Sequence, residues 1–359
     1  MTRGSVLILA GGTGGHVYPA LAVAEVLREQ QCALYWLGTR SGLEADVARR
    51  AGIPFFVVPI KGLRRAGMLR WLSAPLLLIW ATLRALVHVI HLRPDVVLGM
   101  GGFVSGPAGI AAWFCRRPLI IHEQNAVAGL TNRILARFAT RALAGFPRSF
   151  PAPITPEIVG NPVRQAISTL DPPDLRGQDP KAFRILVFGG SRGAHALNRI
   201  VPGALRMLGP ACLNVLHQCG AAEVEKARVL YGRLDGHSTV KVCAFIDDMA
   251  AAYADADLVI ARAGAITVAE ITACGVAAIL IPYPYAVDDH QTANAQFLVE
   301  QGAAVLLPES ELTAARLFEV VSELHADPEK RLSMARRARA LAVPDAARSV
   351  ARCCQELVR

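Results

Sequence analysis

The strongest constraint on this chain is a repeated unit, in which an apolar run leads into a glycine-rich turn and then a helical pattern. Residues 6–10 lead into the turn GGTGG at 11–15, and residues 185–188 lead into GGSRGA at 189–194. Apolar residues at helical spacing follow the first turn, and Pro19 suits the first turn of that helix. Fully apolar strands that alternate with helices are typical of parallel sheets covered on both faces. We therefore predict an α/β chain with two doubly wound parallel-sheet domains.

A proline-rich stretch at residues 147–162 separates the two halves and indicates a domain boundary. We expect one domain at residues 1–162 and a second at residues 163–343. A last helical pattern, at residues 344–359, can pack on either domain. Ligands of doubly wound sheets bind outside the carboxyl ends of the strands, so two facing domains predict an interdomain cleft.

Length and composition limit the classes of protein to consider. The chain has 359 residues, enough for about two domains that each bury a core. Hydrophobic residues make up 53% and charged residues 19%, which excludes a disordered or fibrous chain. The net charge is +9, but an aromatic content of 6% and the lack of a recognisable binding motif argue against nucleic acid as a partner. Eight cysteines without a CxxC pair indicate buried or free thiols in a reducing cytoplasm.

One stretch, residues 71–90, approaches the about 20 consecutive apolar residues that a membrane-spanning helix needs. Arg84 and His88 interrupt it, so we expect an ordinary core helix for most of its length. A dense apolar cluster within it and basic residues just upstream also suit docking on an anionic membrane surface. Both interpretations can hold on different faces of the helix. The cluster consists of Leu76, Leu77, Ile79 and Trp80, and the cations are Lys61, Arg64, Arg65 and Arg70.

The turn at residues 11–15 and the histidine after it form the first candidate site. Four of its five residues lack a Cβ, so backbone N–H groups can approach a phosphate or sugar beside a helix N-terminus. The spacing matches neither a dinucleotide fingerprint nor a P-loop, and a tight structural turn is the alternative. His16 follows directly, and an imidazole, with a pKa of about 6.5, is suited to accept a hydroxyl proton. A structural or solvated histidine is the alternative for His16.

Four polar residues, His122-Glu123-Gln124-Asn125, follow the apolar run at 119–121. This is again the carboxyl end of an expected strand, where folding alone explains four polar residues poorly. Asn125 as a helix cap is the alternative. The pattern is not HExxH, so it does not indicate zinc.

Residues 263–270 follow the apolar run at 258–260 and open a helical pattern. The small residues at its start let a diphosphate approach the helix N-terminus. Glu270 lies one turn into this helix and can accept hydrogen bonds from two adjacent ribose hydroxyls. A capping box formed by Thr267 and Glu270 is the alternative.

Other polar residues near the expected strand ends are less specific. Ser191 and Arg192, in the second glycine-rich turn, can reach a phosphate, and Arg192 can equally be a surface cation. Arg164 can face the cleft or be a solvated linker residue. The acidic pair at 247–248 favours helix capping over a metal, because a helical pattern starts at once. Residues 289–291 precede another helix and can touch a sugar, and no set of ligands approaches metal-site spacing.

Eight segments, taken in order, resemble the MurG family of UDP-N-acetylglucosamine transferases, which is glycosyltransferase family 28. The resemblance extends from Val6 to about Pro344, and the ordered set is specific where no single motif would be. It implies a GT-B fold of two Rossmann-like domains, in which the first takes the lipid acceptor and the second takes UDP-GlcNAc. It also implies that the final helix returns to the first domain. The segments are GGTGGHVYPALAVA, LGMGGFVSGP, HEQNAVAGLTN, VGNPVR, GGSRGA, FIDDMAAAY, RAGAITVAE and DDHQTANA.

The family motifs, matched residue by residue, imply a catalytic histidine and a set of sugar-nucleotide contacts. His16 matches the catalytic histidine proposed for the family, either as general base or as a group that orients the acceptor, and Glu123 is the second candidate for general base. The position of Ile246 borders the uracil, Glu270 matches the ribose-binding carboxylate, and Gln291 lies near the sugar. The implied substrate-binding residues are Thr13, Gly14, Gly15, Asn125, Arg164, Ser191, Ile246, Ala265, Ile266, Thr267, Val268, Ala269, Glu270 and Gln291.

From this resemblance we predict inverting transfer of GlcNAc from UDP-GlcNAc to the 4-hydroxyl of MurNAc in lipid I, which forms lipid II in peptidoglycan synthesis. Helix N-termini stabilise the leaving diphosphate, with no metal and no cofactor, and domain closure excludes water. Ala263 stands where some relatives carry serine, and Arg192 where some carry glutamine. These two differences affect the predicted phosphate contacts and leave the predicted reaction unchanged. The resemblance also implies a peripheral enzyme on the cytoplasmic face of the inner membrane, with other cell-wall synthesis proteins as partners.

Two rival functions share the expected fold. A nonhydrolysing UDP-sugar epimerase would isomerise its sugar nucleotide without a lipid acceptor. A non-catalytic sugar-nucleotide-binding module would lose nothing on His16→Ala. The apolar and basic patch and the polar segment at 122–125 favour the transferase, and an anionic membrane and a diphosphate lipid explain the charge of +9.

Overall fold

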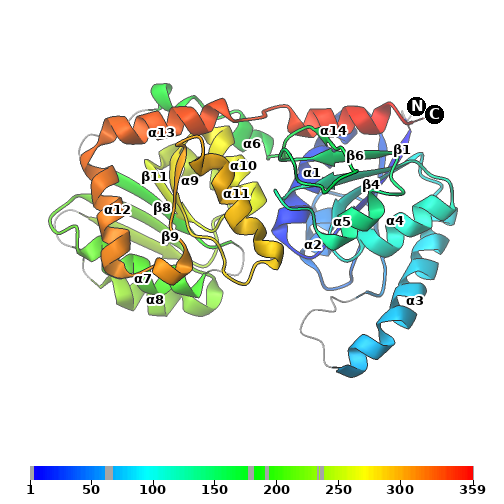
Figure 1. Cartoon of the computed structure of the whole chain (residues 1–359), viewed down its shortest axis with the longest axis horizontal. Helices are drawn as coiled ribbons and strands as arrows, with labels where there is room; N and C mark the ends of the chain where they lie inside the picture. Colours follow the sequence, from blue (N-terminus) through cyan, green and yellow to red (C-terminus); the bar gives the residue numbers. More distant parts are fainter. Residues whose placement is uncertain are drawn as a thin grey trace. The chain divides into compact units, whose positions relative to one another are not determined.

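The structure, a computed structural model, describes residues 4–60, 68–176, 182–190, 194–232, 234 and 238–358. The chain divides into two compact units, Met1–Arg164 with Val343–Arg359 and Gln165–Ala342 (Figure 1). The boundary between the two units therefore falls after Arg164, whereas we predicted it after residue 162. The last helix belongs to the first unit and packs on its first helix.

The first unit contains a fully parallel seven-stranded sheet in the order β3-β2-β1-β4-β5-β6-β7. The chain order reverses between β1 and β4, which lie side by side although a long stretch of chain separates them. Such a reversal is the point at which doubly wound sheets bind their ligands. The strands are β1 Ser5–Ala10, β2 Ala33–Gly38, β3 Phe55–Val57, β4 Val96–Gly101, β5 Leu119–Glu123, β6 Arg141–Ala144 and β7 Glu157–Ile158.

Helices cover both faces of this sheet, because successive residues of its apolar strands point to opposite sides. Val6, Ile8 and Ala10 of β1 pack with α1 and α14 in one core. Leu7 and Leu9 pack with α3 and α4 in the other core. The helices of this unit are α1 Gly14–Glu29, α2 Leu43–Arg50, α3 Met68–Leu92, α4 Ser105–Phe114, α5 Leu130–Leu135 and α14 Ala346–Gln355.

Helix α3 buries only a narrow face. Ala81, Ala85 and Val89 lie in the core, whereas the side chain of Leu76 is 72% exposed and that of Trp80 is 54% exposed. Among the described residues, Ala74–Leu92 is the segment whose length and composition would allow it to cross a membrane, and 17% of its apolar window is buried. The prediction of an ordinary core helix is therefore wrong for most of its length, because apolar spacing alone does not show which face another element covers. The upstream cations Lys61, Arg64, Arg65 and the side chain of Arg70 lie outside the described residues.

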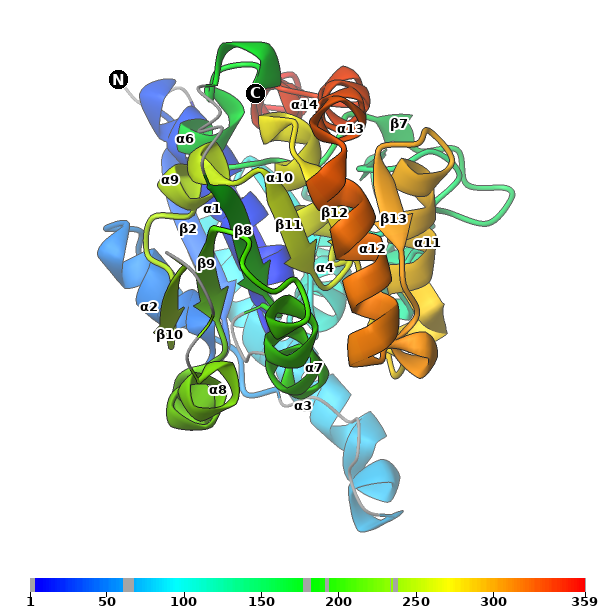
Figure 2. The same cartoon turned by 90° about the vertical axis from the view of Figure 1, so that its left-hand side faces the viewer.

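The second unit contains a parallel six-stranded sheet in the order β10-β9-β8-β11-β12-β13, and its chain order reverses between β8 and β11 (Figure 2). Phe183, Ile185 and Val187 of β8 pack with α7, α8 and α12 in its main core. Helix α10 packs against α11 and α13. The strands are β8 Phe183–Phe188, β9 Leu213–Gln218, β10 Thr239–Cys243, β11 Leu258–Ala261, β12 Ala277–Leu280 and β13 Ala304–Leu306.

The described α-helices of this unit are α6 Gln165–Ser168, α7 His195–Arg206, α8 Val224–Tyr231, α9 Met249–Asp255, α10 Ala265–Cys274, α11 His290–Val299, α12 Ala314–Ala326 and α13 Pro328–Ala340. Short 3₁₀ helices lie at η1 Pro173–Leu175, η2 Ala221–Glu223, η3 Val287–Asp289 and η4 Glu309–Glu311. One predicted cap is confirmed, because the side chain of Asp248 accepts a hydrogen bond of 2.9 Å from the N–H of Ala251 at the start of α9.

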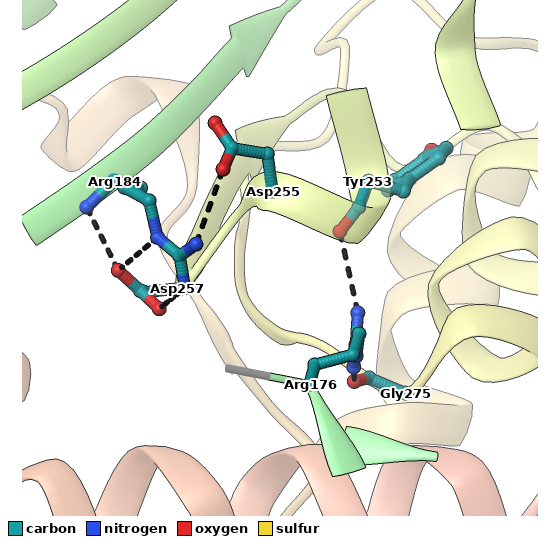
Figure 3. A network of polar contacts seen from close by, with 6 residues as sticks. All are labelled: Arg176, Arg184, Tyr253, Asp255, Asp257 and Gly275. Carbon is teal, nitrogen blue, oxygen red and sulfur yellow. Dashed lines mark hydrogen bonds and ion pairs between the residues drawn. The ribbon is translucent and has the colours of Figure 1, made fainter. Parts of the chain in front are cut away.

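An aspartate in each unit ties the first strand to the strand across the reversal point. Asp95, just before β4, accepts hydrogen bonds of 2.8 Å at Oδ2 from both the backbone N–H and the hydroxyl of Ser5. Asp257, just before β11, accepts three hydrogen bonds from Arg184, one from its backbone N–H and two from its guanidinium (Figure 3). Both clamps lie at the amino-terminal edges of the sheets, so they hold the central strands whose carboxyl ends carry the candidate sites.

Candidate active site

In the first unit, the two glycine turns that follow β1 and β4 pack against each other at the reversal point. A Cβ added at Gly102 would lie 2.1 Å from the backbone oxygen of Gly11, and Gly102 has a φ of +86°. Only glycine allows this approach and this left-handed backbone. The sequence GGTGG and the segment GMGG are therefore two halves of one glycine-lined surface.

Thr13, Gly14 and Gly15 form the edge of this surface where α1 begins. Helix α1 starts at Gly14, with Thr13 in an extended conformation at its N-cap and without a side-chain capping hydrogen bond. The backbone oxygen of Thr13 accepts hydrogen bonds from the N–H groups of His16 and Val17. The first-turn N–H groups of a helix lack intrahelical partners, so this end of α1 is suited to a polar or anionic ligand.

His16 lies in the first turn of α1, whereas the sequence led us to expect it ahead of the helix. Its side chain is half-buried, and its Nδ1 lies 2.9 Å from Oε1 of Gln124, the residue after β5. The ring also lies against β4, because a Cβ added at Gly101 would be 2.7 Å from Nδ1. Residues at the carboxyl ends of β1, β4 and β5 thus meet at one place.

The segment at 122–125 is rigidly held. His122 is fully buried, and its Nε2 lies 2.9 Å from the backbone oxygen of Gly160. Burial lowers the pKa of His122 to about 4, so its imidazole is neutral at neutral pH. Gln124 contacts His122 through its side-chain Nε2, and its backbone oxygen accepts a hydrogen bond of 2.9 Å from the side chain of Asn161.

Glu123 is buried and its carboxylate holds the following loop. Its Oε1 accepts hydrogen bonds from the backbone N–H and the side-chain amide of Asn125, both at 3.0 Å. Its Oε2 accepts from the backbone N–H of Gly129 at 3.1 Å and from the side chain of Asn132 at 2.8 Å. Asn125 therefore does not cap a helix, since α5 begins at Leu130 with Gly129 at its N-cap.

Arg164 ends the first unit. Its guanidinium carbon lies 5.4 Å from the ring centroid of Tyr18, which is on α1. This cation–π contact places Arg164 beside the helix that carries His16.

In the second unit, α10 begins at the carboxyl end of β11, next to the reversal point. Gly264 is its N-cap, with an extended backbone and no side-chain capping hydrogen bond. The alternative capping box of Thr267 and Glu270 is therefore not formed. The six residues from the start of this helix that the sequence singled out are Ala265, Ile266, Thr267, Val268, Ala269 and Glu270.

Glu270 is 6% exposed and has a buried partner that the sequence argument missed. The hydroxyl of Tyr253 donates a hydrogen bond of 3.1 Å to Oε2 of Glu270. The ring of Tyr253 packs edge-on against Phe188, the last residue of β8, with centroids 6.0 Å apart. Arg176 donates to the backbone oxygens of Tyr253 and of Gly275, which follows α10 (Figure 3). Contacts to the middle of α10 and to the residue after its carboxyl end thus hold this carboxylate in position.

The loops after β10 and β12 contribute the remaining candidates. Ile246, after β10, is 9% exposed. Gln291, in the first turn of α11, accepts a hydrogen bond of 2.9 Å at Oε1 from the backbone N–H of Tyr283. Asn294, which the sequence argument missed, donates a hydrogen bond of 3.1 Å to the backbone oxygen of Ala263 and so joins α11 to the start of α10.

Ser191 and Arg192, predicted in the second glycine-rich turn, lie outside the described residues. The described part of the chain holds no group of three or more His, Cys, Asp or Glu side chains that could bind a metal ion.

Models of two protein-domain families match the chain. The glycosyltransferase family 28 N-terminal domain matches residues 6–144, and the glycosyltransferase family 28 C-terminal domain matches residues 184–350. Each model lies largely within one of the two structural units.

Curated relatives and solved structures match over nearly the full length. The UDP-N-acetylglucosamine--N-acetylmuramyl-(pentapeptide) pyrophosphoryl-undecaprenol N-acetylglucosamine transferase of Alkalilimnicola ehrlichii is 54% identical, with 99% of each chain covered. The transferase of the same name from Nitrosococcus oceani is 50% identical, with 98% of each covered. A crystal structure of MurG from Acinetobacter baumannii superimposes with a TM-score of 0.85 at 43% identity, covering 98% of this chain and 99% of that one. A UDP-N-acetylglucosamine 2-epimerase superimposes with a TM-score of 0.62 at 15% identity, which shows a shared fold only.

Proposed function

The chain belongs to glycosyltransferase family 28, and from that premise we propose that it transfers GlcNAc from UDP-GlcNAc to the 4-hydroxyl of MurNAc in lipid I, which forms lipid II. The observation that carries this proposal is the 54% identity over 99% of both chains to a transferase of that name. The structure is compatible with it, because each unit places polar groups at the reversal point of a doubly wound sheet.

The reaction is an inverting displacement. The acceptor oxygen forms a bond to the anomeric carbon of GlcNAc, while the bond from that carbon to the β-phosphate oxygen of UDP breaks. The proton of the acceptor hydroxyl must go to a base, and the leaving diphosphate must be stabilised.

His16 is the proposed base, with the first unit as the acceptor unit. Its half-buried ring borders the glycine surface and is held by Gln124. Glu123 fits this role less well, because its two carboxylate oxygens already accept four hydrogen bonds from the loop that follows it. Its contacts suit a group that shapes the acceptor-side loop.

The second unit is the proposed donor unit. The first turn of α10, at Ala265, Ile266 and Thr267, offers N–H groups to the diphosphate, and small residues there allow close approach. Glu270 receives the ribose hydroxyls, Ile246 borders the uracil, and Gln291 lies near the sugar. Donor contacts are also proposed for Thr13, Gly14, Gly15, Asn125, Arg164, Ser191, Val268 and Ala269. No cofactor or metal is required by this scheme.

We also propose that the protein binds the cytoplasmic face of the inner membrane through one face of α3. Leu76, Ile79, Trp80 and Leu83 are exposed there, which is unusual for so apolar a set. Exposed Trp113 and Phe114 end the neighbouring helix α4 and contact each other. An apolar surface of this kind suits a bilayer interface, and in the sequence basic residues precede it, which favours an anionic one. Other cell-wall synthesis proteins are proposed as partners on the family resemblance alone.

The test of the transferase is transfer of labelled GlcNAc from UDP-GlcNAc to a lipid I analogue, with and without the acceptor. We expect β-linked product and an equal amount of UDP, both dependent on the acceptor. Isomerised UDP-sugar without acceptor would indicate an epimerase instead. Donor binding without any product would indicate a non-catalytic binding module.

The test of the membrane face is sedimentation with vesicles that contain phosphatidylglycerol. Leu76→Glu with Trp80→Glu should abolish binding while leaving transfer to a water-soluble acceptor unchanged, because both side chains are exposed. Glu substitutions at the exposed Val229 and Met207 of the second unit are the matched control and should leave vesicle binding intact. Unchanged binding of the α3 variant would remove this face from the proposal.

A further inference from the structure

We propose that Gln124 and His122 are positioning residues that hold His16 in one tautomer, with the hydrogen on Nδ1 and the lone pair on Nε2. The three side chains form a hydrogen-bonded relay in which every donor and acceptor can be assigned from a fixed end. The tautomer follows from the contacts and from the burial of His122, and only its use in catalysis rests on the proposed function of His16.

The fixed end of the relay is the backbone oxygen of Gly160, which can only accept a hydrogen bond. Nε2 of His122 lies 2.9 Å from it and must therefore carry the hydrogen. Because the buried ring of His122 is neutral, its Nδ1 has a lone pair and acts as an acceptor.

The middle of the relay is the side-chain amide of Gln124. Its Nε2 lies 3.0 Å from Nδ1 of His122 and 3.2 Å from the backbone oxygen of His122. Both of these atoms are acceptors, so the amide NH₂ must face them. The flipped amide would direct its oxygen at two acceptors, which leaves only the observed orientation.

The end of the relay is His16. Once the amide nitrogen of Gln124 faces His122, Oε1 faces His16, and Nδ1 of His16 lies 2.9 Å from it. An amide oxygen only accepts, so Nδ1 of His16 carries the hydrogen. In a neutral ring, Nε2 is then the atom with the lone pair. Close packing against Gly101 keeps the ring in this place, since a Cβ there would lie 2.7 Å from Nδ1.

This tautomer is the one that a base at Nε2 needs. As the acceptor oxygen attacks the anomeric carbon, its proton moves to Nε2, and His16 becomes an imidazolium ion. The Nδ1–H bond to the Gln124 oxygen remains in place and strengthens as the ring becomes charged. A ring with its hydrogen on Nε2 would have no lone pair to offer at that atom.

The direct test is the tautomeric state of His16 in the full-length protein, read from the ¹⁵N chemical shifts of its ring with labelled histidine. We expect hydrogen on Nδ1 for His16 and hydrogen on Nε2 for His122. His217 is an internal reference, because its Nε2 lies 3.2 Å from the Asn198 side-chain oxygen and its Nδ1 lies 2.9 Å from the Tyr231 hydroxyl, which sets hydrogen on Nε2. His16 with its hydrogen on Nε2, or as an even mixture of tautomers, would overturn the relay. This measurement needs no activity and no variant that must fold.

The kinetic test uses two substitutions of Gln124. Gln124→Met removes both hydrogen bonds at similar volume, and kcat should fall on the order of 10–100-fold, with the KM for UDP-GlcNAc within a factor of two. Gln124→Glu keeps an acceptor for Nδ1–H of His16 but loses the donor to His122, so its kcat should lie between those of Gln124→Met and the wild type. If Gln124 had a merely structural role, kcat would fall to a similar extent in both variants, and their thermal stability would fall with it.

The matched control is Gln30→Met at the opposite end of α1, where the side-chain oxygen has no partner among the described residues. Its kcat should equal that of the wild type. Wild-type kcat in Gln124→Met would overturn the proposal. The proposed role of His16 as base is tested separately. It is wrong if His16→Ala keeps normal turnover although the ¹⁵N shifts of the wild-type protein show hydrogen on Nδ1 of His16.

Discussion

The two units of this protein share a frame and differ in the chemistry that they place on it. In each, an aspartate clamp holds the strands on either side of the reversal point, Asp95 with Ser5 in the first unit and Asp257 with Arg184 in the second. At the opposite edge, the first unit carries two hydrogen-bonded imidazoles, His16 and the buried, neutral His122, and the second carries the carboxylate of Glu270 beside an open helix N-terminus.

This difference suits a division of labour between proton transfer and donor binding. A neutral imidazole can take up a proton, whereas a carboxylate held in place recognises a diol and a helix N-terminus stabilises a diphosphate. The fold supplies equivalent positions in the two units, and a few side chains decide what each position does.

The largest effect that would separate the units is expected from His16→Ala. Turnover should fall by on the order of 10²–10⁴, the usual contribution of a general base, because the substitution removes the imidazole that Gln124 holds beside the glycine turns. The dissociation constant of UDP, measured by calorimetry, should change by less than twofold, since His16 is the proposed partner of the acceptor hydroxyl and is not one of the proposed donor contacts. Near-normal turnover would remove His16 from the mechanism.

A second effect, the loss of folding stability at low pH, is expected in both units. Burial lowers the pKa of His122 in the first unit and of His217 in the second to about 4. In an unfolded chain a histidine has a pKa of about 6.5. As the pH falls from about 6.5 to 4, the unfolded state therefore binds protons at these two histidines that the folded state does not bind. Stability is therefore full above that window and declines within it, by about 2–3 kcal/mol per histidine at pH 4.5.

His217→Gln measures how much the second unit contributes to the loss of stability at low pH. Whatever its stability at pH 7, this variant should lose about 2–3 kcal/mol less than the wild type between pH 7 and pH 4.5 in urea unfolding. Gln296→Ala, at an exposed and uncharged position of the same unit, is the control and should keep the wild-type pH dependence. An equal loss in His217→Gln and the wild type would show that His217 does not titrate with unfolding.

Glu270→Gln tests the donor side of the comparison. Loss of a charged acceptor should weaken UDP binding by about 1.5–3 kcal/mol, which is roughly 10–150-fold. The preference for UDP over 2′-deoxy-UDP should shrink as well, because the carboxylate is the proposed partner of the ribose. Glu300→Gln, an exposed carboxylate just after α11, is the control. Full discrimination between the two nucleotides in Glu270→Gln would place ribose recognition elsewhere.

The sequence was sufficient for the frame and for single candidate residues. Runs of apolar residues that end in glycine turns have few solutions other than doubly wound parallel sheets, and the two observed sheets confirm that prediction. His16 and Glu270 became candidates because each follows such a turn. The exposed face of α3 was not predictable from spacing, since apolar periodicity does not reveal whether a neighbour covers a face.

The partners of these candidates were beyond the sequence for a different reason. Gln124 and His16 lie 108 residues apart, and their contact exists only because β1 and β5 end at the same edge of one sheet. Tyr253 and Glu270 likewise come from different helices, α9 and α10. A single sequence carries no signal for such pairs, so the residues that orient a site are harder to predict than those that compose it.

Tyr253→Phe should produce the smallest of these effects and is the finest test of the comparison. It removes the hydroxyl that donates to Glu270 and keeps the ring that packs against Phe188. The loss of one hydrogen bond should weaken UDP binding by about 0.5–1.5 kcal/mol, with kcat at saturating donor unchanged. Combined with Glu270→Gln, it should add less than its separate effect, because the two residues act through one contact. If the two changes in UDP binding free energy, measured by calorimetry, were fully additive, Tyr253 would not act through Glu270. The position of the Glu270 carboxylate would then depend on α10 and not on the Tyr253 hydroxyl.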